Sequence, residues 1–172
     1  MSVTLHTDVG DLKLEIFCDQ TPKTAENFLA LCGSGYYDNT VIHRNIRGFM
    51  VQMGDPTGKG KGGTSIWGRK FEDEIRTALK HDRRGVVSMA NSGPDTNGSQ
   101  FFITYDRQPS LDAKYTIFGC VVDANQDSSS SSSTLDALES LEVGKKNRPL
   151  KETKILSVTI HANPLADPAC IQ

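Results

Sequence analysis

Short segments in which apolar and polar residues alternate recur along this chain and limit the folds that are open to it. Alternation with a period of two places the apolar side chains on one face of a β-strand. Residues 3–7 and 12–17 alternate in this way, and the turn-like sequence of residues 8–11 separates them. The two segments therefore predict a β-hairpin with one buried face.

A first helix is expected to begin at Pro22, because proline lacks the N–H group that the first helical position leaves unpaired. Thr21 is expected to cap this helix through its hydroxyl, and Gly33 to end it. The apolar stripe of the helix, at helical spacing, would consist of Ala25, Phe28, Leu29 and Cys32.

Six consecutive serines, residues 128–133, form the only low-complexity segment of the sequence. Such a run offers no side chains that build a core, so residues 125–133 are expected to form a flexible surface loop. Ser133 or Thr134 would cap a second helix that ends near Gly144. One side of that helix would carry Leu135, Leu138 and Leu141.

Several short strands, loops between them and only two helices favour an antiparallel β-barrel or sandwich. The 172 residues fit one domain. We place this domain at residues 1–164 and expect residues 165–172 to form a loose tail.

Charge and composition argue against several classes of protein. The net charge of −2 and the absence of a basic stripe disfavour direct binding to nucleic acid or to an anionic membrane. No apolar run approaches the roughly 20 residues of a membrane span, and the start of the chain lacks the apolar core of a signal peptide. Four cysteines without CxxC spacing fit free thiols in a reducing compartment. We therefore expect an intracellular protein that is not secreted, with no metal site.

Two further patterns are interpreted as loops. Residues 58–63 satisfy G-x-G-x-x-G, but a dinucleotide site requires a strand before the motif and a helix after it, and no helical period follows. Residues 71–74, Phe-Glu-Asp-Glu, are expected to form a solvated acidic loop.

Residues 42–55, IHRNIRGFMVQMGD, combine a cation, an amide and large apolar groups. In a strand, Met50 and Gln52 would face away from Phe49, Val51 and Met53. If Arg44 shares the face of Gln52, a guanidinium and a carboxamide meet over apolar surface, which suits a peptide bond as ligand. On this segment alone, a buried strand beside a surface arginine is an equal alternative.

Residues 85–104, GVVSMANSGPDTNGSQFFIT, contain two strand-like runs around a loop of turn-forming residues. Together with residues 42–55, they resemble the cyclophilin family of peptidyl-prolyl cis–trans isomerases, and the resemblance extends over residues 3–164. It implies a mainly β fold, a closed eight-stranded antiparallel β-barrel capped by two α-helices. The active groove would lie on the outside of the barrel and would need no cofactor. Residues 125–133 then look like an insertion, because the family usually has a shorter connection there.

The resemblance also implies roles for individual residues. Arg44 would be the catalytic hydrogen-bond donor, and Gln52 would hold the carbonyl side of the substrate. Ala90 and Asn91 would offer backbone groups to the residue before proline, while Gln100 supports the wall of the groove. The apolar pocket for the proline ring would be lined by Phe49, Met50, Phe102 and Leu111.

Two positions depart from the best-known cyclophilins. Ser110 replaces a tryptophan at the rim of the groove, so we expect cyclosporin A to bind weakly if at all. Tyr115 replaces a histidine on the following strand, where its ring can still close the proline pocket.

Within the family, residues 3–17, 110–119 and 158–166 are most similar to a small single-domain branch associated with the spliceosome. This similarity implies spliceosomal protein partners and a location in the nucleus, the cytoplasm or both. We expect a monomeric isomerase that acts on proline-containing peptides and proteins. The alternative is a non-catalytic module that binds a proline-containing segment within a larger assembly.

Overall fold

The computed structural model describes residues 1–125 and 129–162. Strands β1 (Ser2–Thr7) and β2 (Gly10–Ile16) form the predicted hairpin, in which His6 lies opposite Asp11. The apolar residues of their alternating pattern are fully buried, as a one-sided strand requires. The hairpin prediction is confirmed.

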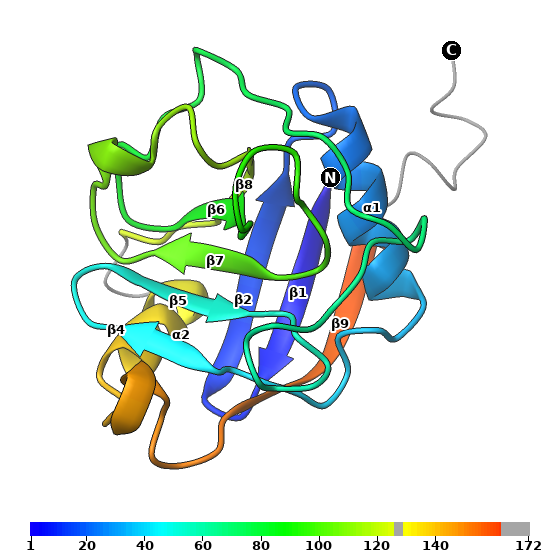
Figure 1. Cartoon of the computed structure of the whole chain (residues 1–172). Coiled ribbons are helices and arrows are strands. Elements are labelled where there is room, and N and C mark those ends of the chain that lie inside the picture. Colours follow the sequence, from blue (N-terminus) through cyan, green and yellow to red (C-terminus); the bar gives the residue numbers. More distant parts are fainter. Residues whose placement is uncertain (126–128, 163–172) are drawn as a thin grey trace.

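Nine antiparallel strands within the described residues form one sheet, in the order β3-β9-β1-β2-β8-β6-β7-β5-β4 (Figure 1). The remaining strands are β3 (Thr40–Val41), β4 (Arg44–Ile46), β5 (Met50–Met53), β6 (Val86–Met89), β7 (Phe101–Thr104), β8 (Ile117–Val121) and β9 (Lys154–Ala162).

The two ends of this sheet, β3 and β4, are neighbours in sequence and are separated only by Ile42 and His43. The N–H of Ile42 still donates to the carbonyl of Thr153, 2.8 Å away, just before β9 begins. The sheet therefore curls round until its two end strands meet, and residues 42 and 43 connect them. If β3 and β4 are counted as one interrupted strand, the nine strands become the eight of the predicted barrel. The fold class is confirmed, with one strand divided in two.

Helix α1 (Pro22–Gly33) has the predicted boundaries, but the predicted cap is wrong. The hydroxyl of Thr21 donates to the carbonyl of Phe17 at 3.1 Å and caps nothing. Glu74 takes that role instead, because its carboxylate accepts hydrogen bonds from the backbone N–H groups of Thr24, at 2.6 Å, and Lys23, at 3.3 Å. A carboxylate at this position satisfies otherwise unpaired N–H groups and favours the positive end of the helix dipole.

The prediction of a solvated acidic loop at residues 71–74 is therefore wrong for two of its members. Glu74 is 8% exposed and Phe71 is 3% exposed. The backbone of Phe71 pairs with that of Asn97, and its ring packs edge-on against Trp67 at 5.3 Å. This segment fastens α1 to the loop before β7.

Helix α2 (Ser130–Glu139) begins inside the serine run, so the flexible loop predicted for residues 125–133 is wrong over residues 129–133. The hydroxyl of Ser129 accepts a hydrogen bond from the N–H of Ser132 at 2.9 Å and caps the helix. Ser131 and Ser132 are buried, and the hydroxyl of Ser131 accepts from the N–H of Lys13 in β2. The predicted caps, Ser133 and Thr134, lie within the helix, which ends at Glu139 rather than near Gly144. Residues 126–128 lie outside the described residues.

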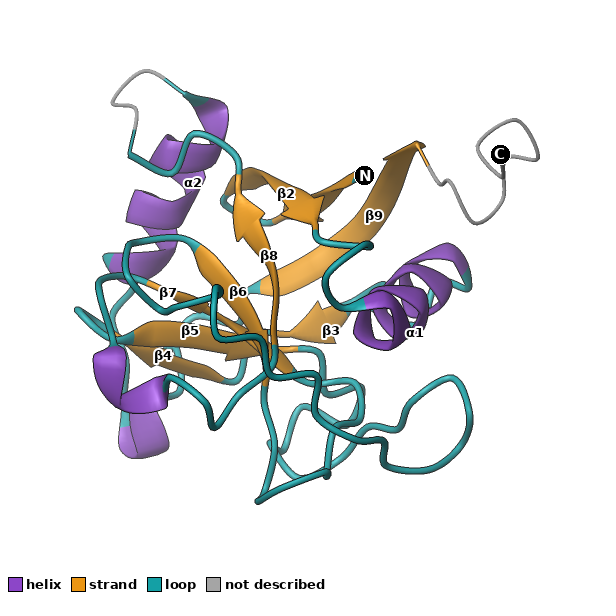
Figure 2. Ribbon diagram, turned by 90° about the horizontal axis from the view of Figure 1, so that it is seen from above, coloured by secondary structure: helices purple, strands orange, loops and turns teal. Residues whose placement is uncertain are grey.

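The two helices lie on opposite sides of the curled sheet (Figure 2). Inside the sheet, an aromatic cluster surrounds Phe28 of α1, whose ring centroid is 5.0–5.5 Å from those of Tyr37, Phe101 and Phe118. Cys32 belongs to the same core, as its position in the apolar stripe predicts.

No helix in the described part of the chain is long and apolar enough to cross a membrane. Among the described residues the thiols of Cys18, Cys32 and Cys120 are free, whereas Cys170 lies beyond them. The proposed domain boundary at residue 164 and the tail at residues 165–172 also lie outside the described residues.

Candidate active site

The antiparallel register of three neighbouring strands brings the central site residues into one row. Arg44 in β4 lies directly opposite Gln52 in β5, and Gln52 lies directly opposite Phe102 in β7. Residues that face each other across antiparallel strands project on the same side of the sheet. The guanidinium and the carboxamide therefore share a face with an aromatic ring, as the hypothesis for residues 42–55 requires.

Phe49 differs from its predicted place in a strand. It lies in the turn between β4 and β5, where its N–H donates to the carbonyl of Ile46 at 3.0 Å. Gly48 takes a φ of +75° in this turn, a conformation that glycine adopts without steric cost. Phe49 is half-buried and joins β5 only at its end, beside Met50.

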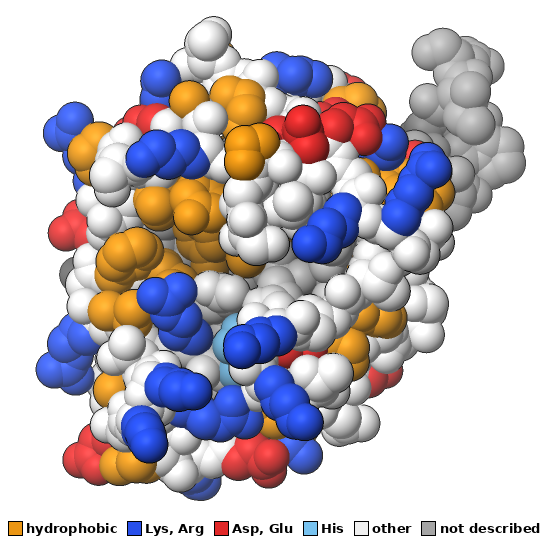
Figure 3. All heavy atoms as spheres, in the orientation of Figure 1, with side chains coloured by type: hydrophobic (Ala, Val, Ile, Leu, Met, Phe, Trp, Pro, Cys, Tyr) orange, Lys and Arg blue, Asp and Glu red, His pale blue; other side chains and the backbone are white. Residues whose placement is uncertain are grey.

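The predicted floor of the proline pocket consists of well-buried apolar residues. Met50 is 3% exposed and Phe102 4%. Tyr115 lies in the bend just before β8 and not on a strand as predicted, and its ring meets that of Phe102 edge-on at 5.5 Å at one side of the pocket. Leu111 is half-buried in the short 3₁₀-helix η1 (Pro109–Leu111), and Ser110 beside it is exposed. Hydrophobic side chains gather around a hollow on the face shown in Figure 3.

Sequence reasoning missed His81, which lies fully buried behind Phe102. The two rings stack at 6.1 Å. The Nδ1 of His81 lies 2.8 Å from a carboxylate oxygen of Asp112, and its Nε2 lies 2.7 Å from the hydroxyl of Ser88. Burial lowers the pKa of His81, although Asp112 opposes this shift. His81 thus links Asp112, the residue after Leu111, to Ser88 in strand β6.

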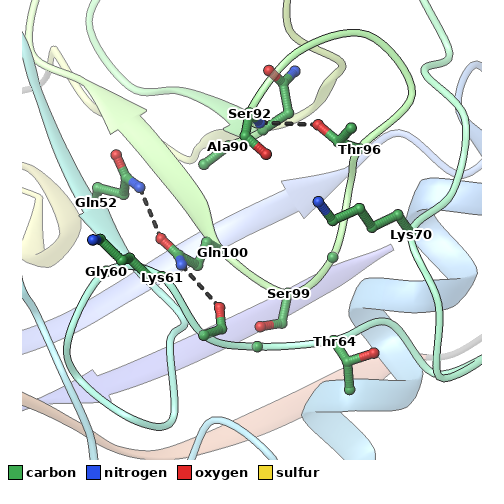
Figure 4. A pocket seen from close by; sticks show the side chains of 14 residues that line it. Gln52, Gly60, Lys61, Thr64, Lys70, Ala90, Ser92, Thr96, Ser99 and Gln100 are labelled. Carbon is green, nitrogen blue, oxygen red and sulfur yellow. Dashed lines mark hydrogen bonds between the residues drawn. The ribbon is translucent and has the colours of Figure 1, made fainter.

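Hydrogen bonds fix the orientation of both glutamine side chains (Figure 4). The carbonyl of Gly62 can only accept, so Gln100 must turn its NH₂ group towards it, at 2.9 Å. The oxygen of Gln100 then accepts from the NH₂ group of Gln52, also at 2.9 Å. Gln52 retains one N–H and its oxygen for a ligand. Gln100 thus orients Gln52 from the wall of the cavity.

A cavity of about 310 Å³ lies beside these amides, and the predicted backbone groups line it. The N–H of Ala90 already donates to the carbonyl of Gln100, so only the carbonyl of Ala90 is left for a substrate. The side chain of Asn91 is held at both ends, because it donates to the carbonyl of Lys114 and accepts from the N–H of Gly93. Residues 91–99 therefore form an internally hydrogen-bonded loop beside the cavity.

The glycine-rich segment opposite that loop is irregular, as predicted, and no helix follows it. Asp55 organises it by accepting hydrogen bonds from the backbone N–H groups of Thr57, Gly60 and Gly62. Burial alone would raise the pKa of Asp55, but these hydrogen bonds hold it below its usual value. A structural carboxylate occupies the inside of the loop, which is unsuited to a dinucleotide phosphate.

Comparison with known proteins identifies the family. Residues 2–160 match the family model of cyclophilin type peptidyl-prolyl cis-trans isomerase/CLD. The protein called peptidyl-prolyl cis-trans isomerase-like 3 is 65% identical in Rhizopus delemar, over 97% of this chain and 98% of the relative. In Homo sapiens the identity is also 65%, over 96% of this chain and 99% of the relative.

Solved structures agree with this result. A cyclophilin type peptidyl-prolyl cis-trans isomerase of Cryptosporidium parvum, crystallised in the presence of the dipeptide Ala-Pro, is 51% identical and has a TM-score of 0.87. The match covers 95% of this chain and all of the other chain. The barrel, the row of site residues and these near full-length matches agree, and the chain belongs to the cyclophilin family of peptidyl-prolyl cis–trans isomerases.

Proposed function

We propose that Arg44 carries the isomerase activity of this protein by donating a hydrogen bond to the nitrogen of a twisted X–Pro peptide bond. The observation that supports this proposal is the row formed by Arg44, Gln52 and Phe102 across three strands. The row combines a strong donor, an amide and an apolar floor at one place on the sheet.

The chemistry follows from the peptide bond itself. Resonance creates a barrier of about 18–20 kcal/mol to rotation, and it also ties up the lone pair of the nitrogen. At the top of the barrier the proline nitrogen is pyramidal, and its lone pair can accept a hydrogen bond. A donor aimed at this nitrogen stabilises the twisted state more than the planar one, as catalysis requires. The Arg44 guanidinium is charged at all working pH values and has no ion-pair partner among the described residues, so it is available as this donor.

The other residues would hold the substrate in place. The proline ring would lie against Met50, Phe102 and Leu111, with Phe49 and Tyr115 at the sides. The remaining N–H of Gln52 would donate to a substrate carbonyl, and the backbone of Asn91 would pair with the residue before proline. The Cryptosporidium parvum relative was crystallised in the presence of Ala-Pro, which supports proline-containing peptides and proteins as ligands of this chain too.

Replacement of Arg44 tests the proposal. Arg44→Ala should lower kcat/KM on a proline tetrapeptide roughly tenfold or more, because a donor that acts in the transition state is lost. Exchange NMR measures this rate directly. Arg47→Ala is the matched control: it removes an exposed arginine from the turn after β4 and should leave the rate within about twofold.

Equal rates for wild type and Arg44→Ala would overturn the role of Arg44. Peptide binding without any acceleration by the wild-type protein would instead support the alternative, a non-catalytic proline-binding module.

We also propose that the partners include spliceosomal proteins and that the protein acts in the nucleus, the cytoplasm or both. Support comes from the similarity of residues 3–17, 110–119 and 158–166 to the spliceosome-associated branch. Affinity purification of the tagged protein from nuclear extract should enrich spliceosomal components. Their absence, together with exclusion of a fluorescent fusion from nuclei, would contradict the proposal.

A further inference from the structure

A second cavity, of about 560 Å³, adjoins the groove and is lined by an unusual set of side chains. We call it the basic pocket. Five of its residues are cations that come from three separate parts of the chain, and no carboxylate from residues 1–125 or 129–162 lines it. Its lining consists of His43, Arg44, Gln52, Lys59, Gly60, Lys145, Lys146 and Arg148.

These cations are not used to hold the fold together by ion pairs. None of the five takes part in a salt bridge within the described residues. Within the described residues the side chain of Arg148 makes one hydrogen bond, from its Nη1 to the carbonyl of Gly58 at 2.5 Å, which holds it beside the glycine-rich loop. Like charges at such close quarters repel one another, so the cluster costs stability unless an anion binds.

His43 provides an independent sign that a ligand is missing. Its side chain lines the basic pocket, it is only 7% exposed, and neither ring nitrogen has a hydrogen-bond partner in the described part of the chain. Buried polar atoms are nearly always paired, because an unpaired one has lost its hydrogen bonds to water without replacement. Burial lowers the pKa of His43, and Arg148 and Arg44 act in the same direction, whereas Asp55 and the nearby side chain of Gln100, whose amide is already bonded to Gln52 and Gly62, oppose them. A neutral imidazole can donate one N–H to an incoming oxygen.

In Figure 3, blue Lys and Arg side chains crowd around pale-blue histidine atoms on the face that carries the groove. The backbone on one side is also unusual, since Lys146 and Asn147 both have a positive φ, near +60°. This geometry turns the segment between α2 and β9 back towards β4 and sets Lys145 and Lys146 against the pocket.

We propose that the basic pocket binds a phosphate monoester, as phosphoserine or phosphothreonine, carried by the same peptide whose proline lies in the groove. A phosphate suits the pocket better than a single carboxylate, because it carries nearly two charges and three acceptor oxygens. The proposal rests on the proposed function, since Arg44 and Gln52 line both the groove and the basic pocket.

The position of the pocket also indicates where the phosphate should be. Ala90 and Asn91, assigned to the residue before proline, line the cavity on the other side of Gln52, and neither lines the basic pocket. The segment that follows proline is therefore the one that passes His43 and the lysines. RNA is disfavoured as the occupant, because the net charge is −2 and the pocket is continuous with a groove for peptides.

The test compares three tetrapeptide-based substrates by exchange NMR: a neutral peptide, one with phosphoserine two residues after proline, and one with phosphoserine two residues before it. For wild type, kcat/KM on the first phosphopeptide should exceed that on the neutral peptide by about tenfold. Lys145→Ala/Lys146→Ala should reduce this ratio to about twofold or less. Lys13→Ala/Arg83→Ala, which removes two exposed cations outside the pocket, should preserve it.

A binding measurement accompanies the kinetics. Titration with the phosphopeptide should shift the imidazole signals of His43, and inorganic phosphate should do so only at much higher concentration. Turnover of the neutral peptide tests the proposed function separately, so a normal rate with a ratio near one overturns this inference alone. The inference is also overturned if the double-lysine variant keeps the ratio, if free phosphate binds as tightly as the phosphopeptide, or if an RNA oligonucleotide shifts the same signals at lower concentration.

Discussion

Arg44, Gln52 and Phe102 share one face because the register between β4, β5 and β7 holds them there. Side chains alternate along a strand, so a slip of one residue in β4 would turn Arg44 towards the core and bring Asn45 outwards. Asn45 is itself anchored, since its side chain donates to the carbonyl of Leu138 and accepts from the hydroxyl of Tyr105. The buried neighbour thus fixes the direction of the exposed arginine.

Ser110 is expected to control drug binding more than turnover. It is exposed at the rim, whereas the proline ring would lie deeper, against Phe102 and Leu111. A tryptophan there would add a large apolar face and one N–H donor. Since such an anchor is commonly worth more than about 2 kcal/mol, Ser110→Trp should tighten cyclosporin A binding roughly thirtyfold. Calorimetry measures the affinity.

The same preparation should keep kcat/KM on a short peptide within about threefold of wild type. Ser110→Ala serves as the control and should change neither quantity appreciably. Tight drug binding by wild type, with no gain from tryptophan, would show that this rim position is unimportant.

Helix α1 depends on a residue far from it in sequence. Glu74 lies 50 residues from Thr24, yet it receives hydrogen bonds from both the N–H and the hydroxyl of that residue. Glu74→Ala should lower the free energy of unfolding by about 1–2 kcal/mol, because two buried donors at the helix start lose their partner. Urea denaturation measures this change.

Glu72→Ala is the matched control for Glu74→Ala, because it removes a neighbouring carboxylate whose partner is the exposed amine of Lys23. Its effect should be small, since exposed ion pairs contribute little. Equal losses for the two variants would rule out the capping role of Glu74.

Helix α2 likewise depends on its serine cap. Ser129→Ala removes the acceptor for the N–H of Ser132 and should lower the free energy of unfolding by about 1 kcal/mol. Ser133→Ala is the control: this side chain is exposed inside the helix, where alanine is the better helix former, so stability should be unchanged or slightly higher. A larger loss for Ser133 than for Ser129 would place the start of the helix elsewhere.

The serine run also shows what could and could not be predicted from sequence. Alternation, helical spacing and Pro22 predicted the hairpin, the start of α1 and an antiparallel barrel or sandwich, because these depend on neighbouring residues, and the family resemblance narrowed the choice to a barrel capped by two helices. The start of α2 depends on a contact between Ser131 and Lys13, 118 residues away, which no local pattern reveals. A composition rich in serine therefore suggested a loop where tertiary contacts favour a helix.

The candidate site likewise contains some residues that the sequence predicted and others that it did not. The two long motifs placed the residues of the groove by family resemblance. By contrast, the contact of His81 with Asp112 spans 31 residues, and the basic pocket brings together residues around 44, 59 and 146. These groups meet only when the barrel closes, so their spacing in sequence carries no recognisable signal.

The stability of the whole protein should fall on mild acidification. The pKa values of His43 and His81 are lowered, chiefly by burial, from an ordinary value of 6.5. Well above pH 6.5 both rings are neutral in the folded and the unfolded chain, so the free energy of unfolding does not depend on their titration there. Below it the unfolded chain takes up protons that the folded protein resists, so the free energy of unfolding decreases.

Urea denaturation at pH 7.5, 6.5 and 5.5 measures this decrease, and His81→Gln should make the dependence shallower. The pKa values of Asp55 and Asp112 are also lowered, but these groups change the stability only below their ordinary pKa of 3.8, which lies outside this pH range. Constant stability from pH 7.5 to 5.5 would contradict the effect of the buried histidines.

Ile42 and His43 link β3 to β4, so the covalent chain itself joins the two ends of the sheet and closes the barrel at this point. A circular permutant that opened the chain between these two residues would delete no hydrogen bond between strands, yet it would remove the covalent link between β3 and β4, the two ends of the sheet, and leave their unpaired edges free to separate. Free edges invite pairing with other molecules, and new chain ends fray. Arg44 would then be the second residue of the new chain, beside a loose end. The bond after Ile42 is therefore one of the worst places to cut this molecule, although it lies at a gap between two strands.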